Sequence, residues 1–389
     1  MSVLAGAAVA TQTNKNRVDN LVRHKKIKLC VVVSSHWAAT FGGAQYQAKC
    51  IIDELIQTNN YDIYYLSRDV NTNYTPEGYN IIQIGSGRHA KKFPLYLDAV
   101  DLYRVLKKID PDILYQRVLN SYTGISAYYA KKYNKKMIWH IAHDDDVQPF
   151  VPSLKKNILN KLVDQKIGQY GIKKSHKIIA QTQRQNNFLQ KYYNRQADAV
   201  IHNFQPKPTE SLDKGNGIKI VWVGNFKPMK RPELFVKLAE DLVHLEDVKL
   251  EMIGRPGNQR QYGMLLEKIL KMNNLYYHGE QPLAEVNRIL SGAHLFVNTS
   301  VAEGFPNTFI QAWMRKVPVI SLGVDVDDLL QTRKYGVCVN TYEGLLAEII
   351  ELIANRERIE NMANNSQKLA FQYFSLDNAK QIMQVMADP

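Results

Sequence analysis

The chain has 389 residues, of which 45% are hydrophobic and 22% are charged, so it is long enough for two domains and too apolar to be disordered throughout. No apolar run is long enough to cross a bilayer. The three scattered cysteines form no Cys-x-x-Cys pair, which argues against a disulfide framework and against structural zinc. Residues 3–10 are apolar but few for a signal peptide, so we expect residues 1–26 to be a flexible leader and the protein to be cytoplasmic.

The positive charge is concentrated in the first half of the chain. Residues 1–200 contain 29 basic and 15 acidic side chains, whereas residues 201–389 contain 21 and 22. A basic half of this kind is expected to meet an anionic partner. Nucleic acid, an anionic membrane surface and a phosphorylated substrate all remain open at this point.

Short apolar segments alternate with amphipathic segments through the first half. The pattern predicts strands at residues 27–34, 61–66, 79–84, 113–116, 137–142 and 177–181. It predicts helices at residues 44–57, 95–109 and 122–133, and a lysine-rich helix at residues 153–169. Such alternation is typical of a parallel sheet that helices cover on both faces.

The rhythm is interrupted after residue 204 and then restarts. Strands are predicted at residues 218–223, 248–253, 294–298 and 317–322, and helices at residues 232–243, 259–272 and 307–314. We therefore divide the chain into an N-terminal domain (27–204), a linker (205–217), a C-terminal domain (218–372) and a C-terminal helix (373–389) that packs back on the N-terminal domain. The expected fold is α/β, with two Rossmann-like doubly wound domains facing each other across a cleft.

Residues 85–90 (GSGRHA) match a dinucleotide-binding pattern, but the match is in the wrong place. That motif joins the first strand of a Rossmann domain to the first helix, whereas this segment follows a third strand. We interpret it as a flexible basic loop.

Polar side chains gather where the strand at residues 137–142 ends. His140 and His143 precede Asp144, Asp145 and Asp146 at the edge of the predicted cleft. The carboxylates could hold a metal ion or cap a solvated turn. We favour a site that contacts a sugar or an acceptor over a metal site.

Residues 221–232 (VWVGNFKPMKRP) predict a strand, a loop and a helix that begins with proline. Lys230 and Arg231 add two cations to the positive end of that helix, which suits a diphosphate. Taken alone, the segment would fit a solvated turn equally well.

Residues 303–311 (EGFPNTFIQ) also lead from a loop into a helix. Amide groups near residues 307–309 can hold a phosphate, and Glu303 can accept hydrogen bonds from hydroxyl groups. Thr308 and Gln311 are three residues apart and share one face of the first turn. A sugar nucleotide carries both phosphates and hydroxyls.

Five segments together resemble the retaining glycosyltransferases of family four, the "glycosyl transferases group 1" set with the GT-B fold. They are FGGAQ (41–45), IAHDDDV (141–147), IIAQTQRQ with HNF (178–185 and 202–204), VWVGNFKPMKRPELF (221–235) and EGFPNTFIQAW (303–313). The resemblance covers nearly the whole chain after the leader.

The resemblance implies roles for individual residues. Lys230 would neutralise the diphosphate with help from Arg231, Glu303 would contact the transferred sugar, and His143 and Asp144 would touch the sugar or the acceptor hydroxyl. The implied residues that bind the sugar nucleotide are Gly42, Gly43, Asn225, Arg231, Gly304, Phe305, Asn307, Thr308, Phe309 and Gln311. Two positions depart from the family pattern, which often has arginine in place of Asn225 and glutamate in place of Gln311.

The implied reaction is the transfer of a hexose-type sugar from a UDP- or GDP-type donor to an acceptor hydroxyl with retention, in polysaccharide or glycolipid synthesis. It would need no metal and no bound cofactor, because the nucleotide sugar is a co-substrate. Two alternatives are an enzyme that resembles UDP-sugar 2-epimerases and a catalytically silent protein that binds sugar nucleotides. We find no nucleic-acid recognition motif.

The basic half would then be the acceptor domain. Six lysines occur at residues 155–174 with Asp164 as the one acid among them, and Tyr128, Tyr129 and Tyr133 lie beside further lysines. Such a mixture suits an anionic membrane face at the inner leaflet. A solvated helix face is the competing interpretation. A carbohydrate or a lipid-linked molecule is the expected acceptor.

Overall fold

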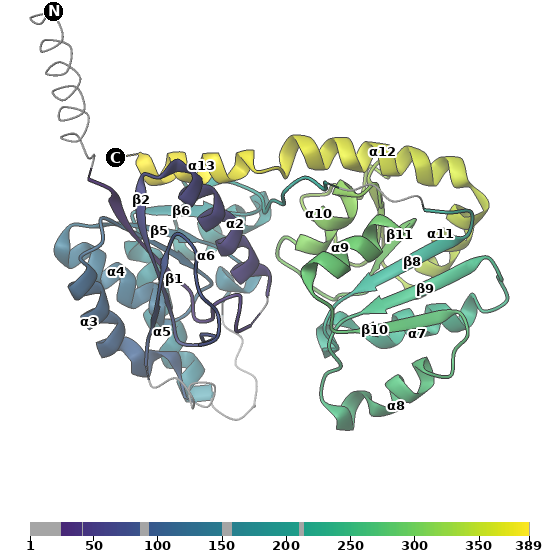
Figure 1. The fold of residues 1–389 in the computed structure, drawn as a ribbon, viewed down its shortest axis with the longest axis horizontal. Helices are drawn as coiled ribbons and strands as arrows, with labels where there is room; N and C mark the ends of the chain where they lie inside the picture. The colour runs from purple at the N-terminus through teal and green to yellow at the C-terminus, as the bar shows by residue number, and fades with distance from the viewer. Residues whose placement is uncertain (1–24, 41, 86–92, 150–157, 210–213, 389) are drawn as a thin grey trace, which may run out of the picture.

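The structure, a computed structural model, describes residues 25–40, 42–85, 93–149, 158–209 and 214–388. Most of the expected leader, Phe41, most of the GSGRHA segment, and Lys155 and Lys156 lie outside the described residues. The chain forms two lobes, each built around a parallel sheet (Figure 1).

The N-terminal domain contains a seven-stranded parallel sheet in the order β3-β2-β1-β4-β5-β6-β7. Its strands are β1 (Ile27–Val32), β2 (Tyr61–Ser67), β3 (Asn80–Gln83), β4 (Ile113–Arg117), β5 (Lys136–His140), β6 (Lys177–Ala180) and β7 (Ala199–Val200). All five residues of β4 are buried, as expected for a central strand covered on both faces.

Helices cover both faces of this sheet. They are α2 (Gly43–Thr58), η2 (Leu95–Asp98), α3 (Ala99–Ile109), α4 (Ser121–Tyr133), η3 (Asp144–Asp146), α5 (Ile158–Lys174) and α6 (Gln183–Tyr193). One apolar core lies between the sheet and α3, α4, α5 and α6, and another lies between the sheet and α2. The single helix expected at residues 95–109 is divided into η2 and α3, and α5 ends about one turn later than expected.

The C-terminal domain repeats the design with a six-stranded parallel sheet in the order β10-β9-β8-β11-β12-β13. Its strands are β8 (Ile218–Val223), β9 (Val248–Ile253), β10 (Leu275–Gly279), β11 (Leu295–Asn298), β12 (Val319–Leu322) and β13 (Gly336–Val339). Its helices are η4 (Pro228–Lys230), α7 (Pro232–Asp241), α8 (Gln259–Ile269), α9 (Leu283–Ser291), α10 (Asn307–Met314), α11 (Tyr342–Ala354) and α12 (Arg356–Tyr373). The expectation of two Rossmann-like α/β domains is confirmed.

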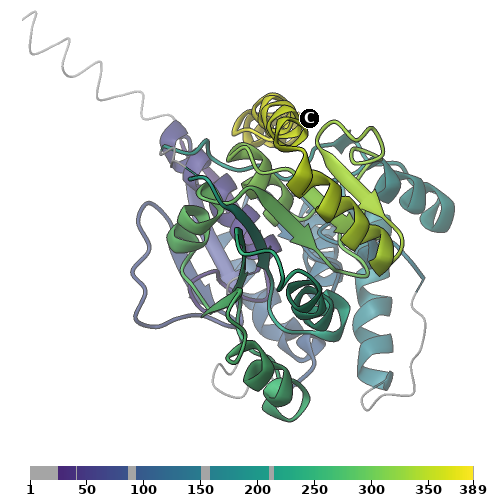
Figure 2. The ribbon, with the colours of Figure 1, turned by 90° about the vertical axis from the view of Figure 1, so that its right-hand side faces the viewer.

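The last helix, α13 (Asp377–Ala387), returns to the N-terminal domain. Ala379, Ile382 and Met386 are fully buried in the same apolar core as α2. Figure 1 shows α12 along the C-terminal domain and α13 continuing over the N-terminal one, and in Figure 2 the yellow C-terminal helices lie near the top of the molecule. The chain therefore crosses between the domains twice, and the two crossings are joined where the amide of Gln205 donates to the carbonyl of Phe374 at 3.0 Å.

Among the described residues, no helix is both long enough and apolar enough to cross a membrane.

Candidate active site between the two domains

A cavity of about 800 Å³ lies between the two domains, where the carboxyl ends of both sheets face each other. Parallel α/β sheets bind their ligands at this end. Eleven of the residues singled out from the sequence line the cavity: Gly42, Gly43, His143, Asn225, Lys230, Glu303, Gly304, Phe305, Asn307, Thr308 and Gln311. Asp144, Arg231 and Phe309 do not line it.

Lys230 and Glu303 form an ion pair on the C-terminal wall of the cavity. Lys230 ends the short helix η4 after β8, and Glu303 lies on the loop between β11 and α10. Their side chains are 25% and 15% exposed, so both remain partly accessible from the cavity. The pair places a cation and a hydrogen-bond acceptor for hydroxyls side by side.

The turn that carries Lys230 is fastened to the end of β11. The hydroxyl of Thr299 donates to the carbonyl of Lys230 at 2.6 Å and accepts the indole N–H of Trp222 at 3.0 Å. The amide of Val301 donates to the carbonyl of Met229 at 2.8 Å. These bonds fix the position of Lys230 relative to Glu303.

Arg231 has a different place from the one expected. Its guanidinium donates to the carbonyls of Thr299 at 2.5 Å, Leu322 at 2.8 Å and Ser300 at 3.2 Å. These three bonds tie the turn after β8 to the ends of β11 and β12, and Arg231 is not among the residues that line the cavity. Arg231 therefore fastens the turn that carries Lys230.

The first turn of α10 meets the glycine turn of the N-terminal domain. The side chain of Asn307 donates to the carbonyl of Gly43 at 3.1 Å and accepts from Gln47 Nε2 at 3.0 Å. Beside it, a Cβ added to Gly304 would lie 2.9 Å from the carbonyl oxygen of Ala142. Two glycines thus allow the close approach that brings both walls of the cavity together.

Phe309 and Gln311 lie on different sides of α10. Phe309 is completely buried against Phe296 and Trp313 in the core, and its amide donates to the carbonyl of Pro306 at 3.1 Å. Gln311 lines the cavity, and its amide group donates to Asn287 Oδ1 at 3.1 Å. The helix therefore presents Gln311, but not Phe309, to the cavity.

His143 and Asp144 also differ in position. His143 lines the cavity, and its Nδ1 accepts the amide of Asp145 at 3.2 Å. Asp144 is turned the other way, where Gln185 Nε2 donates to it at 3.2 Å and Arg184 Nε lies 3.3 Å from it. Burial raises the pKa of the Asp144 carboxyl.

Asp146 shapes the loop that carries His143. Its carboxylate accepts the amides of Ala142 at 2.8 Å, His143 at 3.1 Å and Leu119 at 3.1 Å. Of the three aspartates, Asp146 therefore holds backbone groups, which fits the capped-turn interpretation for this residue. Among the described residues, no group of three or more His, Cys, Asp and Glu side chains could hold a metal ion.

The sequence interpretation missed Arg117, the buried cation at the end of β4. Its side chain is 0% exposed, it lines the cavity, and no carboxylate of the described residues forms an ion pair with it. Its Nη2 donates to Asn203 Oδ1 at 3.2 Å, and Asn203 Nδ2 donates to the carbonyl of Phe305 at 2.9 Å. A buried charge without a counterion is costly, so an anionic ligand in this cavity would relieve it.

Further lining residues follow a strand that was not predicted from the sequence. Residues 280–283 follow β10 and line the cavity together with Val286 of α9. The sequence did carry a signal here, namely the glycine and the proline at positions 279 and 282. In the structure Gly279 has a positive φ of 71°, and Pro282 precedes α9. Both residues mark a turn at the end of a strand.

A second, polar hollow of about 450 Å³ adjoins the cavity and shares Asn225 and Glu280 with it. Its N-terminal wall comes from the loops after β1 and β2 and includes Ser34, Ser35, Thr40, Arg68 and Asp69. The hydroxyl of Thr40 donates to Asp69 at 2.7 Å. The hollow offers hydroxyl and charged groups from both domains.

Two Rossmann-like domains with a cavity between their facing strand ends define the GT-B fold. Residues 203–369 match the family model described as glycosyl transferases group 1. This match covers the C-terminal domain and supports a glycosyltransferase of that group. No curated protein matches the chain in sequence.

Solved structures share the fold over nearly the whole chain. Sucrose-phosphate synthase from Thermosynechococcus elongatus is 14% identical with a TM-score of 0.75, over 93% of this chain and 98% of that one. HepE from Anabaena, solved in complex with UDP-glucose, is 14% identical with a TM-score of 0.71, over 93% and 99%. WaaG, a glycosyltransferase involved in lipopolysaccharide biosynthesis, is 13% identical with a TM-score of 0.72, over 93% and 100%.

Proposed function

We propose that the protein is a retaining glycosyltransferase, which moves a hexose-type sugar from a UDP- or GDP-type donor to an acceptor hydroxyl. The observation that carries the proposal is the Lys230–Glu303 ion pair on the cavity wall, next to the first turn of α10. The family match over residues 203–369 and the complexes of HepE with UDP and UDP-glucose support it.

The C-terminal wall suits the sugar nucleotide. The positive end of the α10 dipole and the ammonium of Lys230 both favour the negative diphosphate. The carboxylate of Glu303 is repelled by phosphate, so its partner is a hydroxyl of the sugar. Glu303 also pairs with Lys230 and holds the ammonium at the cavity wall.

We assign the second diphosphate cation to Arg117. Position 225 carries asparagine, and its side-chain oxygen accepts the amide of Arg255 at 3.0 Å. Arg231 is occupied by carbonyl groups, and Lys227 is exposed outside the lining. Arg117 is the buried cation of the opposite wall, and it can take the place of the arginine that many relatives carry at the position of Asn225.

The chemical step is a substitution at the anomeric carbon. The bond from this carbon to the diphosphate oxygen breaks, the acceptor oxygen bonds to the same face, and the acceptor proton passes to a departing phosphate oxygen. Lys230, Arg117 and the helix end stabilise the charge that develops on the leaving group. No protein nucleophile is needed, and Asp144 is turned away from the cavity towards Gln185. The same cations make a metal ion unnecessary.

We place the acceptor in the polar hollow beside the cavity. Its serine and threonine hydroxyls and its charged groups suit a carbohydrate or the polar head of a lipid-linked sugar. The reaction would then belong to polysaccharide or glycolipid synthesis. The N-terminal domain would act as the acceptor domain, and the protein would work in the cytoplasm.

A screen of nucleotide sugars tests the proposal. A UDP- or GDP-sugar that binds the folded protein will raise its melting temperature, and incubation with an acceptor will release nucleoside diphosphate. An isomerised donor without nucleoside diphosphate would instead indicate an epimerase, and binding without turnover would indicate a silent module. Lys227→Ala is the control, because this exposed lysine lies outside the lining.

A further inference from the structure

A second large groove, of about 920 Å³, lies on the outer side of the N-terminal domain, between α3, α4 and α5. Figure 1 shows α3 and α4 on the side of this domain that faces away from the C-terminal domain. None of the residues that line the groove lines the cavity between the domains. The proposed reaction therefore gives this groove no role.

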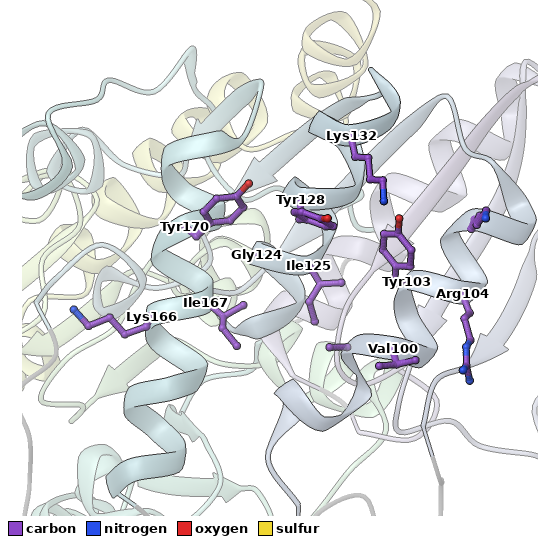
Figure 3. A pocket seen from close by; sticks show the side chains of 12 residues that line it. Val100, Tyr103, Arg104, Gly124, Ile125, Tyr128, Lys132, Lys166, Ile167 and Tyr170 are labelled. Carbon is purple, nitrogen blue, oxygen red and sulfur yellow. The ribbon is translucent and has the colours of Figure 1, made fainter.

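The groove contains two rows of side chains, and each row takes one side chain from each of the three helices. Figure 3 shows Tyr103, Tyr128 and Tyr170 in one row and Val100, Ile125 and Ile167 in the other. Along each helix the lining residues, single or in adjacent pairs, recur every three or four positions, so each helix presents one stripe to the groove. The result is an apolar floor beneath a line of phenol rings.

Exposed apolar side chains extend the groove into a wider surface, which we call the α3–α5 face. Its exposed apolar members are Leu97, Val100, Tyr128, Leu159, Val163 and Tyr170. Val100 is 59% exposed, Leu159 is 74% exposed and Tyr128 is 49% exposed. A contiguous apolar surface of this kind marks an interaction site.

The charge on this face is strongly positive. The segments η2–α3, α4 and α5 contain nine lysines and arginines and three aspartates. Of the aspartates, Asp98 pairs with Arg68, Asp101 accepts the amide of Gly85 at 2.6 Å, and Asp164 accepts the amide of Ser121 at 3.0 Å. All three are thus turned towards groups of the protein itself.

The cations at the groove, in contrast, remain available to a partner. Arg104, Lys107, Lys132 and Lys166 line it, and none of them forms an ion pair with a carboxylate among the described residues. Lys132 lies 5.6 Å from the ring centre of Tyr103 and 5.9 Å from that of Tyr128, so an ammonium group stands beside the row of phenols.

We propose that the α3–α5 face docks on a membrane leaflet that contains anionic lipids. Three kinds of side chain on this face match the layers of such a leaflet. The tyrosines suit the interface, the aliphatic side chains suit the acyl region, and the cations without a carboxylate partner in the described part of the chain suit the phosphate groups. A second copy of the chain fits less well, because a like face would repel it and the C-terminal half is close to neutral. A soluble polyanion also fits less well, because it has no apolar group to cover the row of Val100, Ile125 and Ile167.

Docking in this way would bring the membrane close to the polar hollow. Helix η2 belongs to both regions, since Leu95 lines the hollow and Leu97 is 58% exposed on the α3–α5 face. If the hollow holds the acceptor, as the proposed function states, the acceptor is the head group of a membrane lipid. The docking itself does not depend on that function.

Co-sedimentation of the full chain with vesicles tests the docking. We expect binding to phosphatidylcholine vesicles that contain about one third phosphatidylglycerol, and little binding to phosphatidylcholine alone. The double variant Val100→Ser/Tyr128→Ser leaves the charge unchanged and should lower the bound fraction at least about fivefold. Lys107→Glu/Lys166→Glu should do the same through charge.

The matched control is Lys249→Glu/Lys271→Glu, which makes the same charge change on exposed lysines of the C-terminal domain. It should keep most of the binding. Equal, weak binding to both kinds of vesicle would overturn the proposal, and so would full binding by the Val100/Tyr128 variant or an equal loss in the control. Two further results would overturn it. One is a dimer of the natural protein in sedimentation velocity that is absent in the Val100/Tyr128 variant. The other is vesicle binding that does not depend on anionic lipid and that soluble heparin abolishes.

Donor binding by thermal shift, measured without vesicles, keeps the two proposals separate. Every one of these variants should bind the nucleotide sugar as the natural protein does, because the substituted residues lie outside the cavity between the domains. Normal donor binding with no vesicle binding would refute the docking alone. Vesicle binding without any donor binding would refute the transferase alone.

Discussion

The two domains share the same order over six strands, to which the N-terminal sheet adds β7, but they supply different chemistry to the cavity between them. The C-terminal domain contributes the Lys230–Glu303 pair and the first turn of α10, all close to the ends of β8 and β11. The N-terminal domain contributes a glycine turn, His143 and the buried Arg117. In the proposed function, the shared architecture sets where the sugar nucleotide binds, and a few side chains at the strand ends set which part of it each domain holds.

The largest effect is expected on the C-terminal side. Lys230→Ala removes the cation nearest to the proposed leaving group and should lower kcat/KM about 100- to 1000-fold, or about 3–4 kcal/mol. Steady-state release of nucleoside diphosphate measures this loss. Lys227→Ala should retain the natural rate, and a comparable loss in both variants would place the diphosphate elsewhere.

The corresponding change on the N-terminal side is Arg117→Met. The loss of this cation should lower kcat/KM about 10- to 100-fold, because the diphosphate keeps Lys230. The melting temperature without ligand should stay the same or rise, since replacing a buried unpaired charge with an apolar side chain of similar size removes a desolvation cost. A large fall in melting temperature with natural activity in the surviving protein would show a purely structural role.

The contact between the two walls gives a smaller effect. In Gly304→Ala the new Cβ would lie 2.9 Å from the carbonyl oxygen of Ala142 and 3.2 Å from the Cα of His143. We expect the domains to close less fully and kcat to fall about tenfold. Gly292→Ala is the control, because the nearest atom to its added Cβ is 3.6 Å away. Natural kcat in Gly304→Ala would mean that this approach has no part in catalysis.

The smallest effect concerns stability at low pH, and each domain contributes to it. Burial lowers the pKa of His36 in the N-terminal domain and of His294 in the C-terminal domain from 6.5 to about 4. Between these pH values the unfolded chain binds protons that the folded protein does not bind. The free energy of unfolding should therefore decrease as the pH falls from 6.5 towards 4.

Denaturant unfolding at pH 7 and pH 5 measures this dependence. In the folded protein His294 Nδ1 accepts the amide of Lys219 at 3.2 Å, and His36 Nδ1 accepts the amide of Ala38 at 3.1 Å. Asparagine can accept the same bonds without titrating in this range, so His294→Asn and His36→Asn should each weaken the pH dependence. An unchanged dependence in both variants would assign it to other groups.

The fold could be predicted from the sequence because the buried strands are recognisable as short apolar segments. Five buried residues in β4, together with helices that alternate with strands, fit a parallel sheet covered on both faces. The strands that were not predicted are short: β7 has two residues, β13 has four, and β10 has five. Their patterns are too brief to show a period, and pairing with longer neighbours stabilises them.

The candidate site could be predicted where it follows the chain and not where it depends on distant contacts. Lys230 and Glu303 stand in continuous motifs, and both line the cavity. Arg117 was missed because its position relative to Asn203 and Phe305 arises only in the folded protein. Conversely, Arg231 belongs to a promising motif, but its side chain satisfies carbonyl groups at the ends of two strands.

The hydrogen bond between Gln205 and Phe374 has a mechanical consequence. Two segments of the chain run side by side between the lobes, and the end of the second is anchored by α13 in the core of the first lobe. A paired tether of this kind resists torsion and sliding but still permits bending about one axis. The two connecting segments therefore act as a hinge between the lobes. Removal of α13, which has 11 residues, would weaken this hinge and would remove no residue that lines the cavity.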